Sequence, residues 1–216
     1  MKNALRLSQR SFSSQNSILR PRSSYPLFKA KAATEGKIVG FDSQKLLQNY
    51  LVTVFYPYNF TFVCPTELIA FSDAFEDFKK LKANIIGIST DSVHSHLNWL
   101  RMPRSEGGVA GLKFPLISDS THTISRQFGF LVEDEQDELF GASLRGLVIS
   151  NDKGIVKHVQ ANDAPVGRSV EEALRLIEAF QSVDKNGEVC PANWKPGKAT
   201  MVPDHAKKAE FFKKNY

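Results

Sequence analysis

The sequence predicts an α/β fold in which helices cover both faces of a mixed central sheet. Short runs of β-branched and aromatic residues alternate along the chain with segments whose apolar residues recur every three or four positions. This strand-helix-strand order implies right-handed crossovers between parallel strands. A later pair of strands joined by a tight turn adds antiparallel edge strands.

The first half of this order is a strand, an amphipathic helix, a second strand and a second helix. The first strand is apolar throughout, as expected for a strand buried on both faces. Pro65 suits the first turn of the first helix, and Pro103 ends the second. The four segments are YLVTVFY (50–56), residues 66–81, NIIGIST (84–90) and SVHSHLNWLRM (92–102).

The second half contains a glycine-rich loop, a short helix, a hairpin and a last helix. Asn151 to Gly154 form the hairpin turn, and Ser169 with Glu172 forms a capping box. The segments are the loop EGGVAGLKFP (106–115), the helix 120–129, the strands SLRGLVIS (143–150) and IVKHVQA (155–161), and the helix that begins at Ser169. The complete order is that of the thioredoxin fold, which by itself gives no function.

The composition is that of an ordinary globular protein. The 216 residues are 42% hydrophobic and 24% charged, and no window approaches the uninterrupted apolar run of a membrane span. Two cysteines are too few for a disulfide scaffold, and no cysteine or histidine spacing suggests zinc. Because His94 and His96 are two apart they point to different sides of a helix, so we expect no metal. Trp99 and Trp194 are expected to be packing residues.

Positive charge is concentrated at the N-terminus. Residues 1–34 contain seven basic residues and no acidic one, and the remaining chain has 21 basic and 23 acidic residues. A nucleic-acid-binding protein should carry its positive charge on the folded body, so that class is disfavoured. A serine- and arginine-rich, acid-free head is typical of a transit peptide, which favours the mitochondrial matrix over a plastid. The alternative is a disordered basic arm on a cytoplasmic protein.

We therefore divide the chain into three parts. Residues 1–24 are the transit peptide or disordered head, and residues 25–182 are the folded domain. Residues 183–216 are a polar C-terminal extension with a short helix after Pro203, and this extension carries the second cysteine.

Cys64 has two interpretations. It lies between the carboxyl end of the first strand and the start of a helix, where ligands bind in open α/β sheets and where helix N–H groups stabilise an anion. Such a position favours the thiolate, which is the nucleophilic form of cysteine. A free cysteine is also often a small buried hydrophobe, and position alone leaves the two interpretations equal.

The second thiol is distant. A thioredoxin-type active site needs a cysteine three residues on, where this chain has Glu67. The other cysteine, Cys190, lies in the polar segment GEVCPANWKPG, where packing gives little reason to bury a thiol. A reactive thiol with a distant resolving thiol is typical of a peroxide-reacting cysteine cycle.

Several motifs resemble those of the peroxiredoxins. PYNFTFVCPTE is similar to the family's P-x-x-x-T-x-x-C motif, with Pro57, Thr61 and Cys64 in register. The resemblance covers residues 45–216 and is closest to the typical two-cysteine subgroup. Residues 25–50 resemble the family's opening strands only loosely, and we assign no site residue there. The other segments that carry it are GISTDSVHSHLNW (87–99), SLRGLVISNDKG (143–154), NDAPVGRSVEEALRL (162–176) and GEVCPANWKPG (187–197).

The resemblance implies roles for six residues at the site of the first thiol. Cys64 would attack the peroxide and become a sulfenic acid, while Thr61 would accept a hydrogen bond from the peroxide and Pro57 would shield the thiolate from water. Arg145 would bring a fixed positive charge to the sulfur and to the departing oxygen; the alternative is a surface ion-pair partner. Two further residues would form a supporting polar network: Glu67 and Arg168.

The resemblance also implies the rest of the cycle. Cys190 of the partner subunit would resolve the sulfenic acid to a disulfide, which requires a homodimer and often a decameric ring of dimers. Thioredoxin or a similar dithiol protein would reduce the bridge, with hydrogen peroxide or alkyl hydroperoxides as substrates. No metal, haem or flavin cofactor is needed. A redox relay and a holdase chaperone are the rival functions.

Two departures from the family bear on oxidation sensitivity. Oxidation-sensitive eukaryotic members carry a Gly-Gly-Leu-Gly loop and a C-terminal Tyr-Phe pair that pack over the site. This chain has Ala110 at the last glycine and Phe211 at the tyrosine. We expect Ala110 to lose access to positive φ and Phe211 to lose a tethering hydroxyl. The expected result is a looser cover, faster disulfide formation and moderate resistance to overoxidation.

Overall fold

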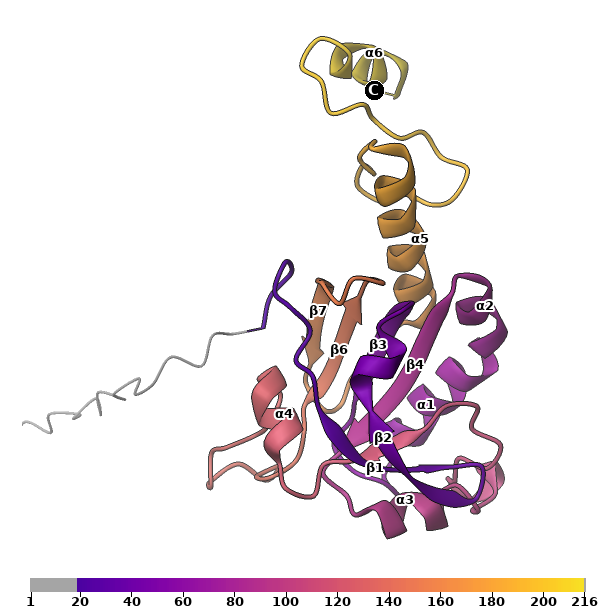
Figure 1. Ribbon diagram of the computed structural model, residues 1–216, viewed down its shortest axis with the longest axis vertical. Coiled ribbons are helices and arrows are strands. Elements are labelled where there is room, and N and C mark those ends of the chain that lie inside the picture. Colours follow the sequence, from indigo (N-terminus) through magenta and orange to yellow (C-terminus); the bar gives the residue numbers. More distant parts are fainter. Residues whose placement is uncertain (1–18, 216) are drawn as a thin grey trace, which may run out of the picture.

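The computed structural model describes residues 19–215, which form one seven-stranded mixed sheet (Figure 1). The strand order is β2-β1-β5-β4-β3-β6-β7. The β3–β4 and β4–β5 pairs are parallel, and the other neighbours are antiparallel. The strands are β1 (Lys29–Thr34), β2 (Lys37–Asp42), β3 (Tyr50–Phe55), β4 (Ala83–Ser89), β5 (Leu116–Ser118), β6 (Arg145–Ser150) and β7 (Val156–Asn162).

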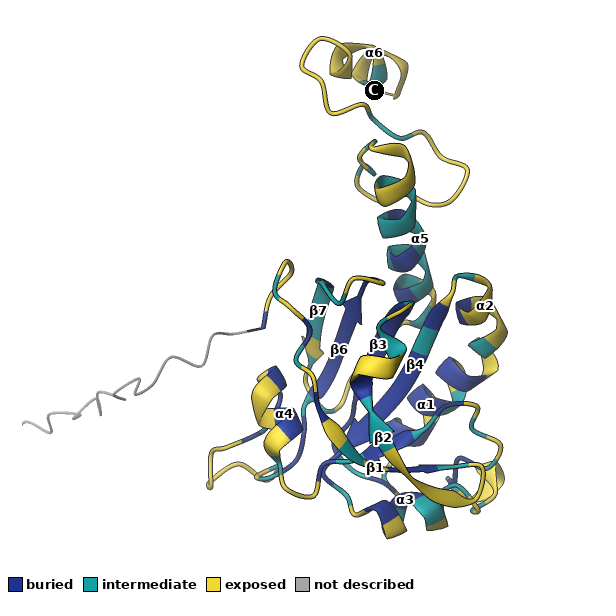
Figure 2. Cartoon of the chain, viewed as in Figure 1, coloured by how far each residue is buried: buried dark blue, intermediate teal, exposed yellow. Residues whose placement is uncertain are grey.

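Helices cover both faces of the sheet, and each face has its own apolar core. The first core joins the sheet to α1, α2, α5 and Trp99 of α3, and the second joins it to α4 and to residues 19–28. Figure 2 shows the buried strands between these layers. The helices are α1 (Val63–Asp73), α2 (Phe75–Lys80), α3 (Val93–Trp99), α4 (Thr123–Phe128), α5 (Val170–Asn186) and α6 (Lys208–Asn215), with two 3₁₀ turns, η1 (Ser43–Leu46) and η2 (Arg104–Glu106).

The position of β3 in the sheet explains why the strand has no polar face. Val52 and Val54 belong to the first core, whereas Leu51 and Phe55 belong to the second. All six residues of the strand are buried, because it lies between β4 and β6 and is covered on both sides. The predicted mixed α/β sheet with flanking helices is thus confirmed.

The predicted helix 66–81 is wrong in its bounds. It begins earlier, at Val63, and it is divided at Ala74 into α1 and α2. Cys64 therefore lies inside the first helical turn instead of before it. The next helix, α3, also ends three residues before its predicted end at 102. The spacing of apolar residues continues across a helix break such as the one at Ala74, so this spacing did not mark where the helices begin or end.

Two features of the sheet were not predicted. The hairpin β1–β2 turns at Glu35 and Gly36, which both have positive φ as a tight hairpin turn requires. The first strand, KAKAAT, is rich in lysine and alanine, which are weak strand formers, and the second, KIVGFD, has a short apolar run that a glycine interrupts. Strand β5 has only three residues and follows Pro115, so its apolar run is too short for a sequence pattern.

The two ends of the folded body pack more closely than their composition suggests. Within the predicted head, residues 19–24 contact the hairpin turn: Arg22 donates its backbone N–H to Val156, and Ser24 pairs with Ile155. The rest of the head, residues 1–18, lies outside the described residues. At the other end, α5 continues to Asn186, and Gly187 with φ 69° ends it. In residues 19–215 no helix has the length and apolar character needed to cross a membrane.

Candidate active site

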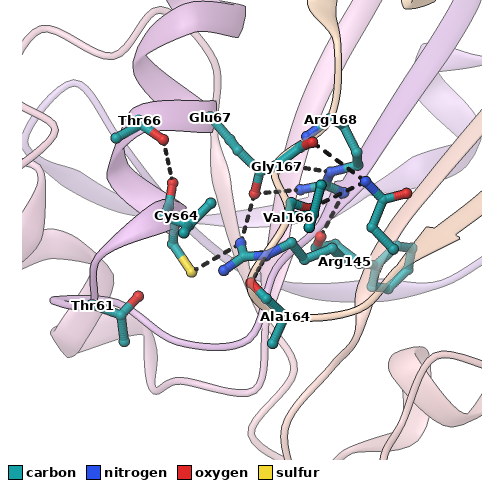
Figure 3. A network of polar contacts seen from close by, with 12 residues as sticks. Thr61, Cys64, Thr66, Glu67, Arg145, Ala164, Val166, Gly167 and Arg168 are labelled. Carbon is teal, nitrogen blue, oxygen red and sulfur yellow. Dashed lines mark hydrogen bonds and ion pairs between the residues drawn. The ribbon is translucent and has the colours of Figure 1, made fainter.

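Cys64 lies at the junction of α1 and β6, two elements that adjoin because β3 pairs with β6. The thiol is fully buried among apolar residues of the first core. Its sulfur faces the guanidinium of Arg145, whose Nη1 is 3.4 Å from Sγ (Figure 3). The side chain is thus buried, as the interpretation of a small hydrophobe expects, and it also contacts a fixed cation, so the nucleophile interpretation stays a prediction.

Glu67 lies one helical turn after Cys64 and holds two arginines together. Its Oε2 accepts a hydrogen bond from Arg145 Nη1 at 2.7 Å. Its Oε1 accepts from both the backbone N–H and Nε of Arg168, at 2.8 and 2.7 Å. All three side chains are almost completely buried, so water does not screen these ion pairs.

Arg168 connects this carboxylate to the ends of two strands. Its Nη1 donates to the carbonyl of Phe55, at the end of β3, and to that of Gly146 in β6. The residue directly precedes Ser169, the N-cap of α5. One side chain thus fixes the relative positions of α1, β3, β6 and the start of α5.

The charges in this cluster do not balance. Two guanidinium groups and one carboxylate leave one net positive charge in a buried site. Burial makes an uncompensated charge costly, so negative charge on the adjacent sulfur is favoured. The first-turn position of Cys64 adds the free N–H groups of α1. The arrangement therefore places a buried cation and free helix N–H groups beside the Cys64 sulfur.

Three further features belong to the candidate site. Thr61 lies on the sulfur side of Cys64 (Figure 3), and its hydroxyl donates to the carbonyl of Tyr58 at 3.1 Å. Because that proton is used, the Thr61 oxygen is free to accept only. Pro57 is buried two residues after the end of β3. Arg145 Nε donates to the carbonyl of Ala164, which fixes the guanidinium plane.

Cys190 is not brought to Cys64 within the chain, and both are free thiols. Its Sγ is 3.7 Å from the carbonyl oxygen of Ala179, on the side of α5. Ala179 lies nine residues after the first residue of α5, which is about 14 Å along a helix axis. Burial raises the pKa of the Cys190 thiol, and the positive charge of Arg175 opposes this only in part.

The segment around Cys190 is better packed than its polar sequence suggests. Trp194 is buried, and its Nε1 donates to the carbonyl of Lys198. Arg175 of α5 donates to the carbonyl of Trp194 at 2.9 Å and pairs with Glu172. The prediction that Trp99 and Trp194 are packing residues is confirmed.

The structure corrects the expectation about Ala110. Positive φ occurs in this loop at Gly107 and Gly111, and Ala110 does not adopt it. Ala110 therefore loses nothing by lacking the freedom of glycine. Gly108 is the constrained position, because a Cβ there would lie 2.1 Å from the carbonyl oxygen of Met102. Phe211 stacks edge-on against Phe212 in α6, which lies beyond the far end of α5 from α1 (Figure 1).

One buried polar cluster beside the site was not predicted. His96 was judged only as a metal ligand, but it is completely buried and contacts Asn59 and Tyr56. His96 lies 37 positions from Asn59 and 40 from Tyr56, so no local pattern signals its contacts with them. Within residues 19–215, no group of three or more histidine, cysteine or acidic side chains is arranged to hold a metal ion.

Two family models match the chain. The AhpC/TSA family matches residues 21–159, which contain Cys64, Glu67 and Arg145. The C-terminal domain of 1-Cys peroxiredoxin matches residues 179–214, which contain Cys190.

Relatives and solved structures agree with these matches. A peroxiredoxin of Cynops pyrrhogaster is 50% identical over 192 residues, which are 88% of this chain and 92% of the relative. A thioredoxin peroxidase of Echinococcus granulosus is 47% identical over 178 residues, 82% of this chain and 90% of the relative. The reduced two-cysteine peroxiredoxin of Plasmodium vivax superposes with a TM-score of 0.84 at 37% identity, covering 89% of this chain and 98% of that one. The chain therefore belongs to the AhpC/TSA family and is a two-cysteine peroxiredoxin, an enzyme that reduces peroxides with a thiol.

Proposed function

We propose that Cys64 is the thiol that reacts with the peroxide. Its thiolate attacks one oxygen of hydrogen peroxide or an alkyl hydroperoxide, the O–O bond breaks, and the products are the Cys64 sulfenic acid and hydroxide or alkoxide, which takes up a proton. The observation that carries this assignment is the 3.4 Å contact between Sγ and Arg145 in a buried cluster of net positive charge.

The surrounding groups have separate roles in this step. Arg145 stabilises both the thiolate and the negative charge that develops on the departing oxygen. Thr61 accepts a hydrogen bond from the peroxide and orients it, a role supported by the commitment of its own proton to Tyr58. Pro57 keeps bulk water from the sulfur. Glu67 and Arg168 act through Arg145 by holding its guanidinium in place.

Cys190 of a partner subunit completes the oxidative half of the cycle. Its sulfur attacks the sulfenic sulfur, water leaves, and an intersubunit disulfide forms. Cys190 lies against Ala179, about 14 Å along α5 from the start of that helix, and it forms no bond to Cys64 within the chain, which supports a second chain as the source of the attacking thiol. Because Cys64 is buried in the first turn of α1, that turn must unwind before the bridge can form. The unit of function is then a homodimer, assembled into a decameric ring.

The proposal also includes the reductant and the compartment. A thioredoxin or similar dithiol protein reduces the bridge by exchange and returns both thiols. The basic, acid-free head directs the enzyme to the mitochondrial matrix. A solved two-cysteine peroxiredoxin of Plasmodium falciparum, 38% identical with a TM-score of 0.72, is described as mitochondrial.

Peroxide consumption with thioredoxin, its reductase and NADPH tests the cycle. We expect turnover in the native chain and none in Cys64→Ser. Cys190→Ser should react once and stop, since its sulfenic acid has no resolving thiol. Non-reducing electrophoresis after one equivalent of peroxide should give a dimer band that requires both cysteines. Undiminished turnover in Cys64→Ser contradicts the assignment, and a band at monomer size alone contradicts the intersubunit bridge.

A further inference from the structure

Asn59 lies in the loop between β3 and α1, between two residues assigned to the peroxide site. Pro57 precedes it by two residues and Thr61 follows it by two. The intervening Phe60 has a φ of 56°, a left-handed conformation that is uncommon for an aromatic residue. Phe60 is also half exposed, so burial of its own side chain does not explain the conformation. Neighbouring contacts must hold the backbone in this shape.

The contacts of Asn59 supply that restraint. Its backbone N–H donates to Asp91 at 2.9 Å, and its side-chain amide donates to Ser95 at 2.8 Å and lies 3.0 Å from Nδ1 of His96. Its Oδ1 accepts from the hydroxyl of Tyr56 at 2.9 Å. Asn59 is buried, and these partners come from the residue after β3, from the loop between β4 and α3, and from α3 itself.

The protonation of His96 follows from its acceptors. Nε2 is 3.2 Å from the carbonyl of Ile117, which can only accept, so Nε2 carries the proton. Nδ1 is then a lone pair that accepts from the Asn59 amide. Burial lowers the pKa of His96 to about 4, against the opposing effects of Asp91 and the Ile117 carbonyl. The ring is therefore neutral at working pH and matches a neutral amide.

The same cluster approaches the reactive sulfur through Tyr56. Burial raises the pKa of Tyr56, and the charges of Asp91 and Cys64 raise it further, so its hydroxyl remains a donor. The titratable groups around His96 are thus Asp91 from the end of β4, Tyr56 from the end of β3 and, through Tyr56, Cys64 from α1. The exposed His94 is the other histidine of α3, and β5 contributes only the carbonyl of Ile117.

We propose that Asn59 and His96 are positioning residues that hold the β3–α1 loop, and with it Pro57 and Thr61, in the geometry required for attack on the peroxide. The inference rests on the proposed reaction at Cys64. Neither side chain is assigned contact with the substrate. Their effect is exerted through the backbone of residues 57–61.

The test measures the reaction of Cys64 with hydrogen peroxide by stopped flow in a Cys190→Ser background, which isolates the first step. Rates are measured from pH 5.5 to 8.5. Each is divided by the rate of the parent, the Cys190→Ser protein, at the same pH, so that any pH dependence shared by all variants cancels. Asn59→Ala should lower the rate about tenfold or more at every pH, because displacement of positioned groups by about 1 Å costs rate steeply.

Asn59→Asp distinguishes positioning from a general loss of structure. In this variant a carboxylate lies beside Nδ1 and raises the pKa of His96. Protonated His96 can donate a hydrogen bond from Nδ1 to the carboxylate, and this bond is lost as the pH rises through the raised pKa. The rate ratio of Asn59→Asp should therefore be near that of the parent at low pH and fall towards that of Asn59→Ala at high pH. Adding His96→Gln removes the titrating group and should flatten the profile.

Two results would overturn the inference. One is a rate for Asn59→Ala within twofold of the parent, and the other is an equal rate ratio for Asn59→Ala and Asn59→Asp at all pH values. Should Asn59→Ala fail to fold by circular dichroism, Ser95→Ala removes only one acceptor and should still slow the reaction several-fold; an unchanged rate there counts against the inference. If the parent itself does not react, the proposed function fails instead.

Discussion

The two cysteines lie in opposite electrostatic surroundings. Cys64 is buried beside Arg145 in a cluster that carries one net positive charge, at the N-terminus of a helix. Cys190 is half buried against the carbonyl oxygen of Ala179, and burial raises the pKa of its thiol. The comparison shows that burial alone does not decide the state of a thiol. The sulfur of Cys64 lies beside a fixed cation, whereas burial holds the pKa of the Cys190 thiol above its ordinary value.

The largest effect should come from removing the cation from the first thiol. Arg145→Met keeps the length of the side chain but removes the charge, and we expect the rate of Cys64 oxidation to fall by about 10²–10³-fold. Arg126→Met is the matched control, because Arg126 forms an exposed pair with Glu133 and should be neutral. Equal rates for the two variants, measured by stopped flow, would show that Arg145 has no special role.

The next effect should appear in stability. Glu67→Gln removes the carboxylate that pairs with both buried guanidinium groups, and breaking such a buried pair costs about 3–5 kcal/mol. The free energy of unfolding should fall accordingly in urea denaturation. Glu76→Gln, on the exposed face of α2, should be unchanged within error. A loss in Glu67→Gln no larger than in Glu76→Gln is incompatible with a buried ion network.

A smaller effect should distinguish disulfide formation by Cys190 from the oxidation of Cys64 by its pH dependence. Because the pKa of Cys190 is raised from the ordinary value of 9.0, its thiolate fraction should still be rising at pH 9. Disulfide formation, which follows the thiolate, should therefore accelerate with pH by up to about tenfold per unit in that range. Fluorescence of Trp194, four residues from Cys190, can follow this step. A rate that is flat between pH 7 and 9 would mean that Cys190 does not attack from this environment.

The smallest effect should come from Ala110→Gly. Since Ala110 has no positive φ, restoring glycine should leave the ratio of disulfide to sulfinic acid unchanged when peroxide is titrated under turnover and read by intact mass. Gly108→Ala is the informative partner, because its Cβ would clash with Met102 and disturb the loop. A clear change in Ala110→Gly would restore the expectation that this position loosens the cover.

The sequence was sufficient for four of the seven strands and for the charged cluster, for different reasons. Periodicity identified β3, β4 and the β6–β7 hairpin, because their residues are apolar on both faces or alternate around a tight turn. Resemblance to a family selected Glu67, Arg145 and Arg168, whose contacts span 78 to 101 positions and carry no local signal. The β1–β2 hairpin was missed because β1 is rich in weak strand formers and a glycine interrupts the short apolar run of β2. Strand β5 was missed because its run is too short.

The Asn59–His96 contact could not be predicted for a related physical reason. Asn59 is in a loop and His96 on a short helix, and each is a residue type that is usually exposed. Only the folded arrangement shows that burial makes His96 neutral and complementary to an amide. Polar groups buried between distant segments are therefore the part of this site that the structure adds.

Trapping of the first oxidised species tests the central difference between the two thiols most directly. Cys190→Ser and Cys64→Ser are each treated with one equivalent of hydrogen peroxide in the presence of dimedone, and the adduct is located by peptide mass spectrometry. We predict a sulfenic acid adduct on Cys64 within the mixing time and none on Cys190. An adduct that forms on Cys190 as fast as on Cys64 would contradict the account.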